Sequence, residues 1–225
     1  MKVKKLNSYK ELSSTVADIV EEQLVEKVFQ QLVLPTGSTP IGLYKELAKR
    51  NLNWSYVRTF NLDVYIMNPN HSQSYQTFMK ENLFNRINIY PDNCHFPFRP
   101  TLAYEDKINY FGGVDLCILG IGSNGHIAFN EPGSSFKSRT RVVDLDEQTI
   151  QDNSRFFDSV DDVPKQAITM GIGTIMESKK IILMASGDHK KDILEKALNG
   201  KVTEDVPASV LQTHKNVEVY YHWSI

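Results

Sequence analysis

Four groups of side chains in this 225-residue chain have the types and spacing needed for acid–base chemistry on an anionic substrate. Asp63 follows the apolar run at 57–62, and a carboxylate at the carboxyl end of a buried strand is well placed to act as a general base. His126 and Glu131 lie in and after a glycine-rich stretch and offer a second acid–base pair. A helix cap or turn at Asp63, and a structural histidine at 126, are the alternatives for each residue taken alone.

The other two groups are suited to binding an anion. Thr36, Gly37, Ser38 and Thr39 precede Pro40 at an expected helix start, with Thr39 as the N-cap. Free N–H groups and the positive end of a helix dipole favour an anion there. The stretch lacks the Gly-Lys-Ser/Thr of a nucleotide-binding P-loop, so a plain helix cap is the alternative. The segment 187–191 places Lys190 at another helix start, where a solvated charge cluster is the alternative.

The stretch at 120–125, Gly-Ile-Gly-Ser-Asn-Gly, matches the dinucleotide-binding fingerprint, but its context argues against that function. The fingerprint needs a helix directly behind its last glycine, whereas Pro132 and Gly133 would end any helix within two turns. We expect instead a loop that lets a ligand approach the backbone, as at Gly122, and that presents His126 and Glu131. The histidines and Cys94 show no metal-ligand spacing, so no catalytic metal is predicted.

Alternating apolar runs and amphipathic segments must position these groups. Strands are expected at 31–34, 57–62, 114–119, 181–185 and 217–221, and helices at 9–29, 72–86, 101–111, 190–198 and from residue 40. Ser8 is expected to cap the first helix, with Glu11 as its capping-box partner, and Gly200 to follow the last as a C′ residue. This order predicts an α/β fold: a single-domain (1–225), doubly wound, mostly parallel, Rossmann-like sheet with helices on both faces. Ligands bind at the carboxyl ends of such strands.

Composition excludes several classes of protein. The chain has 25 Lys and Arg against 27 Asp and Glu, which predicts neither a nucleic-acid partner nor an anionic-membrane partner. With 41% hydrophobic residues it is not a disordered chain. The first ten residues lack an apolar run, so no signal peptide is expected. Two cysteines, Cys94 and Cys117, fit reduced thiols in the cytoplasm.

Taken together, these stretches resemble the glucosamine-6-phosphate deaminase (isomerase) family, in its short bacterial branch. The likeness runs in order from about residue 30 to the C-terminus, and its most specific part is Gly-His-Ile-Ala-Phe-Asn-Glu-Pro at 125–132. The other matching segments are 34–40, 60–63 with Tyr65, 138–140, 153–157, 163–165 with 167–171, and 207–209 with Leu211 and His214.

The resemblance implies a reaction and a role for each candidate residue. Family enzymes convert an amino-sugar phosphate to a ketose phosphate and ammonia without metal or organic cofactor. The position matching Asp63 moves a proton from C2 to C1, and those matching His126 and Glu131 open the sugar ring. The phosphate is held by the loop matching 36–39 and by positions matching Arg155 and Lys190.

Three departures from the family pattern bear on these expectations. Val64 replaces a glutamate found in many members, and Asn124 replaces an aspartate of the larger members, where an amide can still orient the imidazole. Larger members also use a basic residue at the position of Val143 and an extended tail for allosteric activation. We therefore expect no amino-sugar activator site, and a monomer or dimer.

The leading hypothesis is isomerisation and hydrolytic deamination of glucosamine 6-phosphate in amino-sugar catabolism. The alternatives are the same reaction on galactosamine 6-phosphate, a hydrolase like 6-phosphogluconolactonase, and a non-catalytic sugar-phosphate sensor. The segments 68–81 and 148–164 are candidates for a mobile lid.

Overall fold

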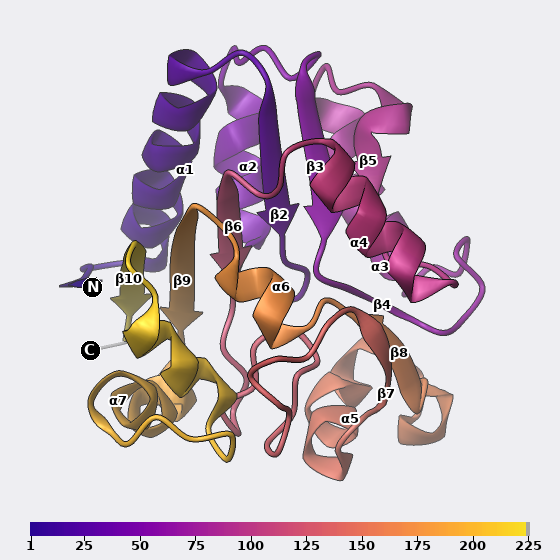
Figure 1. The fold of residues 1–225 in the computed structure, drawn as a ribbon, viewed down its shortest axis with the longest axis vertical. Helices are drawn as coiled ribbons and strands as arrows, with labels where there is room; N and C mark the ends of the chain where they lie inside the picture. The colour runs from indigo at the N-terminus through magenta and orange to yellow at the C-terminus, as the bar shows by residue number, and fades with distance from the viewer. Residues whose placement is uncertain (224–225) are drawn as a thin grey trace.

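Seven parallel strands form the central sheet of the computed structural model, which describes residues 1–223. All six strand pairings in this sheet are parallel, so the strands' carboxyl ends lie at one edge, in the lower half of Figure 1. In spatial order the strands are β1 (Lys2–Lys5), β10 (Val217–His222), β9 (Lys180–Ser186), β6 (Leu116–Leu119), β2 (Gln30–Leu34), β3 (Val57–Asn61) and β5 (Cys94–His95).

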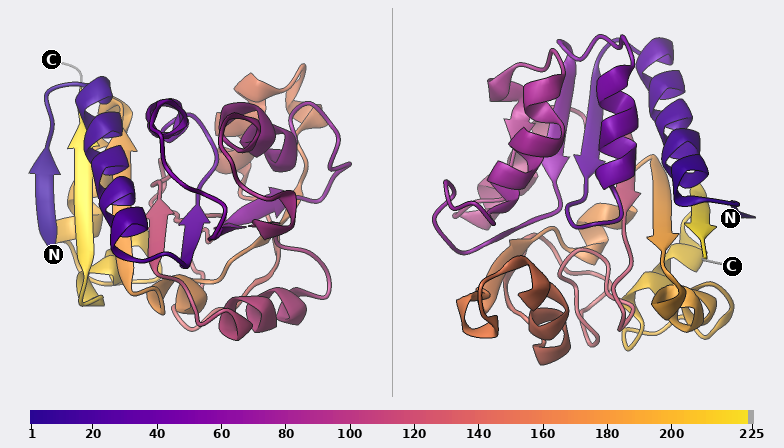
Figure 2. Two further views of the ribbon diagram at one scale, coloured as in Figure 1. Left: turned by 90° about the horizontal axis from the view of Figure 1, so that it is seen from above. Right: turned by 180° about the vertical axis from the view of Figure 1, so that it is seen from behind.

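Helices cover both faces of this sheet because its central strands are apolar on both sides. Leu32 and Leu34 pack under one layer and Val33 under the other. The first layer, in front in the right panel of Figure 2, contains α1 (Tyr9–Glu26), α2 (Ile41–Lys49) and α3 (Tyr75–Asn82). The second contains α4 (Thr101–Tyr110), α6 (Ile172–Met176) and α7 (Lys191–Asn199). The predicted doubly wound, mostly parallel sheet is confirmed.

A second, antiparallel sheet was not predicted. It consists of β4 (Asp63–Tyr65), β8 (Gln166–Thr169) and β7 (Arg141–Asp144), in that order, with α5 (Glu147–Asn153) following β7. Each strand has only three or four residues, which is too short for alternation to be recognised in the sequence. The expected turn at Asp63 is therefore the start of a strand.

Several local predictions were wrong at element ends. The first helix stops at Glu26, where Lys27 turns to extended backbone and its Nζ pairs with Asp115 Oδ1 at 2.8 Å. Pro40, and not Thr39, is the N-cap of α2. Gly200 has a φ of −80°, so it is not a left-handed C′ residue. The predicted Ser8 cap is confirmed, since its side chain accepts a hydrogen bond from the Glu11 N–H.

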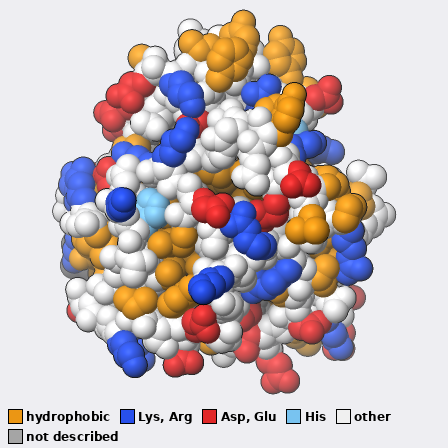
Figure 3. Space-filling view, viewed as in Figure 1, with side chains coloured by type: hydrophobic (Ala, Val, Ile, Leu, Met, Phe, Trp, Pro, Cys, Tyr) orange, Lys and Arg blue, Asp and Glu red, His pale blue; other side chains and the backbone are white. Residues whose placement is uncertain are grey.

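Short 3₁₀ helices occur in several of the connecting segments: η1 (Phe84–Arg86), η2 (Pro91–Asn93), η3 (Ser154–Phe156), η4 (Val160–Asp162), η5 (Asp188–Lys190) and η6 (Pro207–Thr213). The predicted helix at 72–86 is thus α3 followed by η1. Within residues 1–223, no helix is long and apolar enough to cross a membrane. Positive and negative side chains are mixed over the face in Figure 3, as the near-balanced charge leads one to expect.

The strand order reverses beside β2. From β2 the chain proceeds to β3 and β5 on one side, then returns to β6 on the other side and continues to β9 and β10. Such a switch point leaves a crevice between the loops that follow the two central strands, and ligands of doubly wound sheets bind there. In this chain those loops begin at Pro35 after β2 and at Gly120 after β6.

Candidate active site

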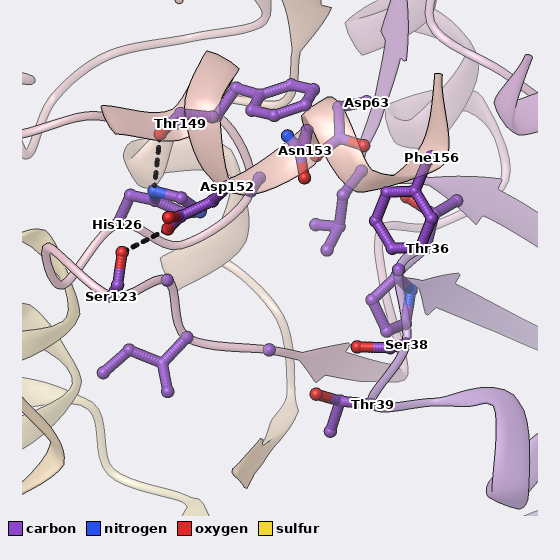
Figure 4. A pocket seen from close by; sticks show the side chains of 18 of the residues that line it. Thr36, Ser38, Thr39, Asp63, Ser123, His126, Thr149, Asp152, Asn153 and Phe156 are labelled. Carbon is purple, nitrogen blue, oxygen red and sulfur yellow. Dashed lines mark hydrogen bonds between the residues drawn. The ribbon is translucent and has the colours of Figure 1, made fainter. Parts of the chain in front are cut away.

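A cavity of about 430 Å³ lies at this switch point. Figure 4 shows Thr36, Ser38 and Thr39 on one side of it and Ser123, His126 and Asp152 on the other. Asp63 and Lys190 also line the cavity, although they are 127 residues apart in the sequence. The fold therefore brings the four predicted groups to one place. Of the predicted site residues, the cavity lining includes Thr36, Gly37, Ser38, Thr39, Asp63, Gly122, His126, Arg155 and Lys190.

Asp63 stands where the chain passes from one sheet to the other. Only Leu62 separates β3 from β4, and its backbone bonds to both sheets. The Leu62 N–H donates to Leu34 O at 3.3 Å, and the Leu62 carbonyl accepts from Met170 N at 2.7 Å. This double attachment fixes the backbone on which the Asp63 carboxylate is carried.

The Asp63 carboxyl is buried, with 6% of the residue exposed. Burial raises its pKa from the ordinary 3.8 to about 7, and burial is the only influence on that pKa. An uncompensated carboxylate of this kind is half-ionised near neutral pH, which is the range in which a general base works best.

The backbone geometry of the 36–39 loop suits an anion. Gly37 has a φ of +89°, which favours glycine, and within residues 1–223 the backbone N–H groups of 36–39 donate no hydrogen bond. Tyr9 fixes the loop from α1, because its hydroxyl donates to Thr39 O at 2.9 Å and accepts from Gly42 N at 2.7 Å. The free N–H groups lie at the start of α2, where the helix dipole adds a positive field.

Two cations line the same cavity as the 36–39 loop. Arg155 and Lys190 line the cavity from η3 and η5. Burial, and then the positive charge of Arg155, lowers the pKa of Lys190 to about 8, while Asp152 acts in the opposite direction. Two cations that line one cavity are suited to share a dianionic group between them.

The His126 imidazole pairs with the Glu131 carboxylate. Its Nδ1 lies 3.2 Å from Glu131 Oε2, which also accepts a hydrogen bond from Asn124 Nδ2 at 2.8 Å. Burial alone would raise the pKa of Glu131, but hydrogen bonds from His126, Thr149 and Asn124 outweigh it and lower that pKa. A carboxylate that remains ionised at Nδ1 leaves Nε2 as the nitrogen for proton exchange.

The expected roles of Asn124 and Gly122 are modified by this arrangement. The Asn124 amide does not contact the imidazole directly. Its Nδ2 donates to the Glu131 carboxylate, and its Oδ1 accepts a hydrogen bond from the backbone N–H of His126 at 3.2 Å. Gly122 lies under the imidazole, since a Cβ there would be 2.2 Å from His126 Cε1. Glu131 and Asn124 lie behind His126 and are not part of the cavity lining.

In the segment 149–156, sequence reasoning identified Arg155 but missed four other residues. Thr149, Asp152, Asn153 and Phe156 line the cavity and recur at helical spacing, which was the signal available in the sequence. The polar composition of the segment instead indicated a loop. Tyr75 and Phe129 were also missed; their rings stack with centroids 6.0 Å apart and form an aromatic wall of the cavity.

The predicted absence of a metal or organic cofactor remains a prediction. Among residues 1–223, no group of three or more His, Cys, Asp or Glu side chains is arranged to hold a metal ion.

Comparisons with known proteins agree with the fold and identify the family. Residues 5–221 match the family described as glucosamine-6-phosphate isomerases/6-phosphogluconolactonase. "Glucosamine-6-phosphate deaminase 2" of Bacillus subtilis (strain 168) is 52% identical over 234 residues, covering 97% of this chain and 94% of the relative. A solved structure described as a monomeric glucosamine-6-phosphate deaminase superimposes with a TM-score of 0.95 at 42% identity, covering 99% and 97% of the two chains.

A more distant solved structure shares the fold alone. The 6-phosphogluconolactonase of Thermotoga maritima superimposes with a TM-score of 0.81 at 22% identity, over 99% of both chains. The family match over nearly the whole chain, and the relatives at 42% and 52% identity, settle the membership. This chain belongs to the glucosamine-6-phosphate isomerase/6-phosphogluconolactonase family.

Proposed function

We propose that this protein converts glucosamine 6-phosphate and water into fructose 6-phosphate and ammonia, as an enzyme of amino-sugar catabolism. One observation carries the proposal: a buried carboxyl with a pKa of about 7 shares a cavity with a carboxylate-backed histidine and an anion-binding loop. The B. subtilis relative at 52% identity, whose name is that of a deaminase, supports the same reaction.

Binding begins with the phosphate. The free N–H groups of 36–39 and the Arg155 and Lys190 side chains receive it, which orients the sugar toward the centre of the cavity. His126 Nε2 then takes the proton of the anomeric hydroxyl and passes it to the ring oxygen, and the bond between C1 and the ring oxygen breaks to give the open-chain aldehyde. Glu131 stabilises the imidazolium while that proton is exchanged.

Asp63 carries out the isomerisation. Its ionised carboxylate takes the proton from C2 and returns it to C1, so that the open-chain aldose becomes an enolamine and then a ketose imine. Water adds to the imine carbon and ammonia leaves, which gives fructose 6-phosphate. In this scheme the base must be unprotonated at the start, and a pKa of about 7 leaves a large fraction of it so at neutral pH.

A coupled assay tests the proposal. Purified protein is incubated separately with glucosamine 6-phosphate, galactosamine 6-phosphate and 6-phosphogluconolactone. We expect ammonia and fructose 6-phosphate from the first, and no acceleration of lactone hydrolysis. Ammonia from only the galacto epimer would move the proposal to that substrate. Lactone hydrolysis without ammonia release would replace it with a hydrolase, and binding of glucosamine 6-phosphate without turnover would indicate a sensor.

We further propose that the protein works in the cytoplasm as a monomer or dimer. Cys94 and Cys117 are both free thiols, which fits a reducing compartment. The solved relative at 42% identity is described as monomeric. Light scattering coupled to gel filtration tests the assembly; a mass above that of a dimer would contradict it.

A further inference from the structure

One short segment touches both halves of the cavity. Residues 147–156 form α5 and η3, and they carry Arg155 at the anion site and Thr149 beside His126. Asp152, between them, accepts hydrogen bonds from Ser123 Oγ at 2.5 Å and Gln148 Nε2 at 2.8 Å. The segment is therefore bonded to the glycine loop, and the dashed lines in Figure 4 mark its contacts from Asp152 to Ser123 and from Thr149 to His126.

Thr149 lies beside both members of the acid–base pair, which are in direct contact with each other. The residue is 2% exposed, and its Oγ1 is 3.4 Å from His126 Nδ1. Its hydroxyl also contributes to lowering the pKa of Glu131, so it lies near the carboxylate as well as the imidazole. One hydroxyl can accept from the Nδ1–H and donate to a carboxylate at the same time.

The carboxylate has room for this donor. Glu131 Oε2 is occupied by His126 and Asn124, whereas Oε1 is buried and has no hydrogen-bond partner at normal distance within the described residues. A buried carboxylate oxygen without a donor is unfavourable, and a small movement of a nearby hydroxyl would relieve it. The 3.4 Å contact of Thr149 is also long for a hydrogen bond, and catalytic contacts often tighten only in the substrate complex.

We infer that Thr149 is a positioning residue that transmits phosphate capture at Arg155 to the His126–Glu131 pair. This inference rests on the proposed function. When the phosphate draws Arg155 into the cavity, η3 and α5 move together because they are continuous. The Thr149 hydroxyl then closes on the pair and fixes the imidazole for proton transfer to the ring oxygen. Binding energy from the phosphate, which does not react, is thereby used at the reacting end of the sugar.

Histidine NMR tests the coupling with inorganic phosphate as the probe. His189 lines the cavity next to Lys190 and reports whether phosphate is bound, while His126 reports whether the signal reaches the pair. In the wild-type protein, phosphate should shift the ring ¹⁵N resonances of both histidines. In Thr149→Val, which keeps the shape and removes the hydroxyl, it should shift only His189.

Three outcomes would overturn the inference. In the first, phosphate shifts the His189 resonance of the wild-type protein and leaves His126 unchanged. In the second, phosphate shifts His126 in Thr149→Val as much as in wild type. In the third, neither resonance of the wild-type protein moves.

Kinetics with glucosamine 6-phosphate provide the second readout. Thr149→Val should lower kcat by about tenfold to a hundredfold, as expected for a displaced catalytic group, with a smaller change in KM. Thr149→Ser, which restores the hydroxyl, should remain within threefold of wild type. Gln151→Ala, an exposed change on the same helix, should remain unaffected.

Equal kcat values for the Val and Ser variants would refute the positioning role. A wild-type protein that releases no ammonia would instead refute the proposed function, so the two failures are distinguishable.

Discussion

Two buried carboxyls in this protein have opposite surroundings. Glu105, on α4, is 5% exposed; it accepts hydrogen bonds from the backbone N–H and hydroxyl of Thr140 and the hydroxyl of Thr174, and pairs with Arg139 at 2.7 Å. Asp63 is 6% exposed, and burial alone governs its pKa. Burial would raise the pKa of Glu105 too, but its hydrogen bonds lower it.

The difference separates stability from function. The Glu105 network ties α4 to α6 and to the chain entering β7, so its compensated charge stabilises the junction between the two sheets. At Asp63 the same degree of burial is left uncompensated, which destabilises the ionised form and raises the pKa of the proposed base to about 7. In this protein, hydrogen-bond donors surround Glu105, which stabilises the fold, whereas the proposed base Asp63 has no such compensation.

The largest expected effect is at the base. Asp63→Asn keeps the shape and removes the ability to accept a proton, so ammonia release should fall by about 10²–10⁴-fold. The melting temperature at pH 7.5 should be unchanged or higher, because an uncompensated buried charge has been removed. Activity within tenfold of wild type would contradict the assignment.

The matched change at the compensated carboxyl should act on stability. Glu105→Gln removes the anion that the two threonines bond, and leaves Arg139 with Glu177 alone, so the free energy of unfolding should fall by roughly 2 kcal/mol. For a chain of this length that corresponds to a drop of about 4–8 °C in melting temperature. At a temperature at which the Glu105→Gln variant remains folded, its kcat should be within a few-fold of wild type. A large loss of kcat with unchanged stability would reverse the comparison.

Two glycines sharpen the same contrast. Gly122→Ala would place a methyl group against the His126 ring, so kcat should fall by about 100-fold with little change in stability. Gly171→Ala would place a methyl group 2.2 Å from the Ser138 carbonyl oxygen, next to the hydrogen-bond network of Glu105. Overpacking of this kind costs about 1–3 kcal/mol of stability and should spare kcat. Calorimetry measures the stability of both glycine variants, and the ammonia assay measures their kcat.

The two carboxyls should also respond to pH with opposite signs. The folded pKa of Asp63 is above its ordinary value, so its ionisation destabilises the fold increasingly from about pH 4 to pH 7. The pKa of Glu105 is below its ordinary 4.5, so its stabilisation is present above that pH and is lost as the pH falls through the folded pKa. Asp63→Asn should flatten the stability curve between pH 4 and 7, and Glu105→Gln should reduce stability most above pH 5. Denaturant unfolding across pH checks both.

The smallest effect concerns Lys190. Its pKa of about 8 means that its charge is lost as the pH rises through that value, so KM should rise several-fold between pH 7 and 9. Lys190→Arg, which stays charged, should keep KM flat over the same range. A wild-type KM that does not change with pH would show that the lysine charge does not contribute to phosphate binding.

The sequence was sufficient for the groups that motifs mark. Asp63 at a strand end and His126 in a glycine loop could be predicted because strand ends of a parallel sheet converge at one edge. For Thr149 and Asp152 the sequence offered only their helical spacing, since their entry into the cavity depends on where α5 packs. Likewise, β4, β7 and β8 are too short to be recognised, and only their pairing reveals that Asp63 stands at the junction of two sheets.

The most direct test is the titration of Asp63 itself. The ¹³C NMR carboxyl spectra of wild type and Asp63→Asn are compared across pH, and the resonance present only in wild type belongs to the Asp63 carboxyl. This measurement does not require turnover. The uncompensated burial predicts a midpoint at about pH 7. A midpoint near the ordinary value of 3.8 would contradict the account of the base.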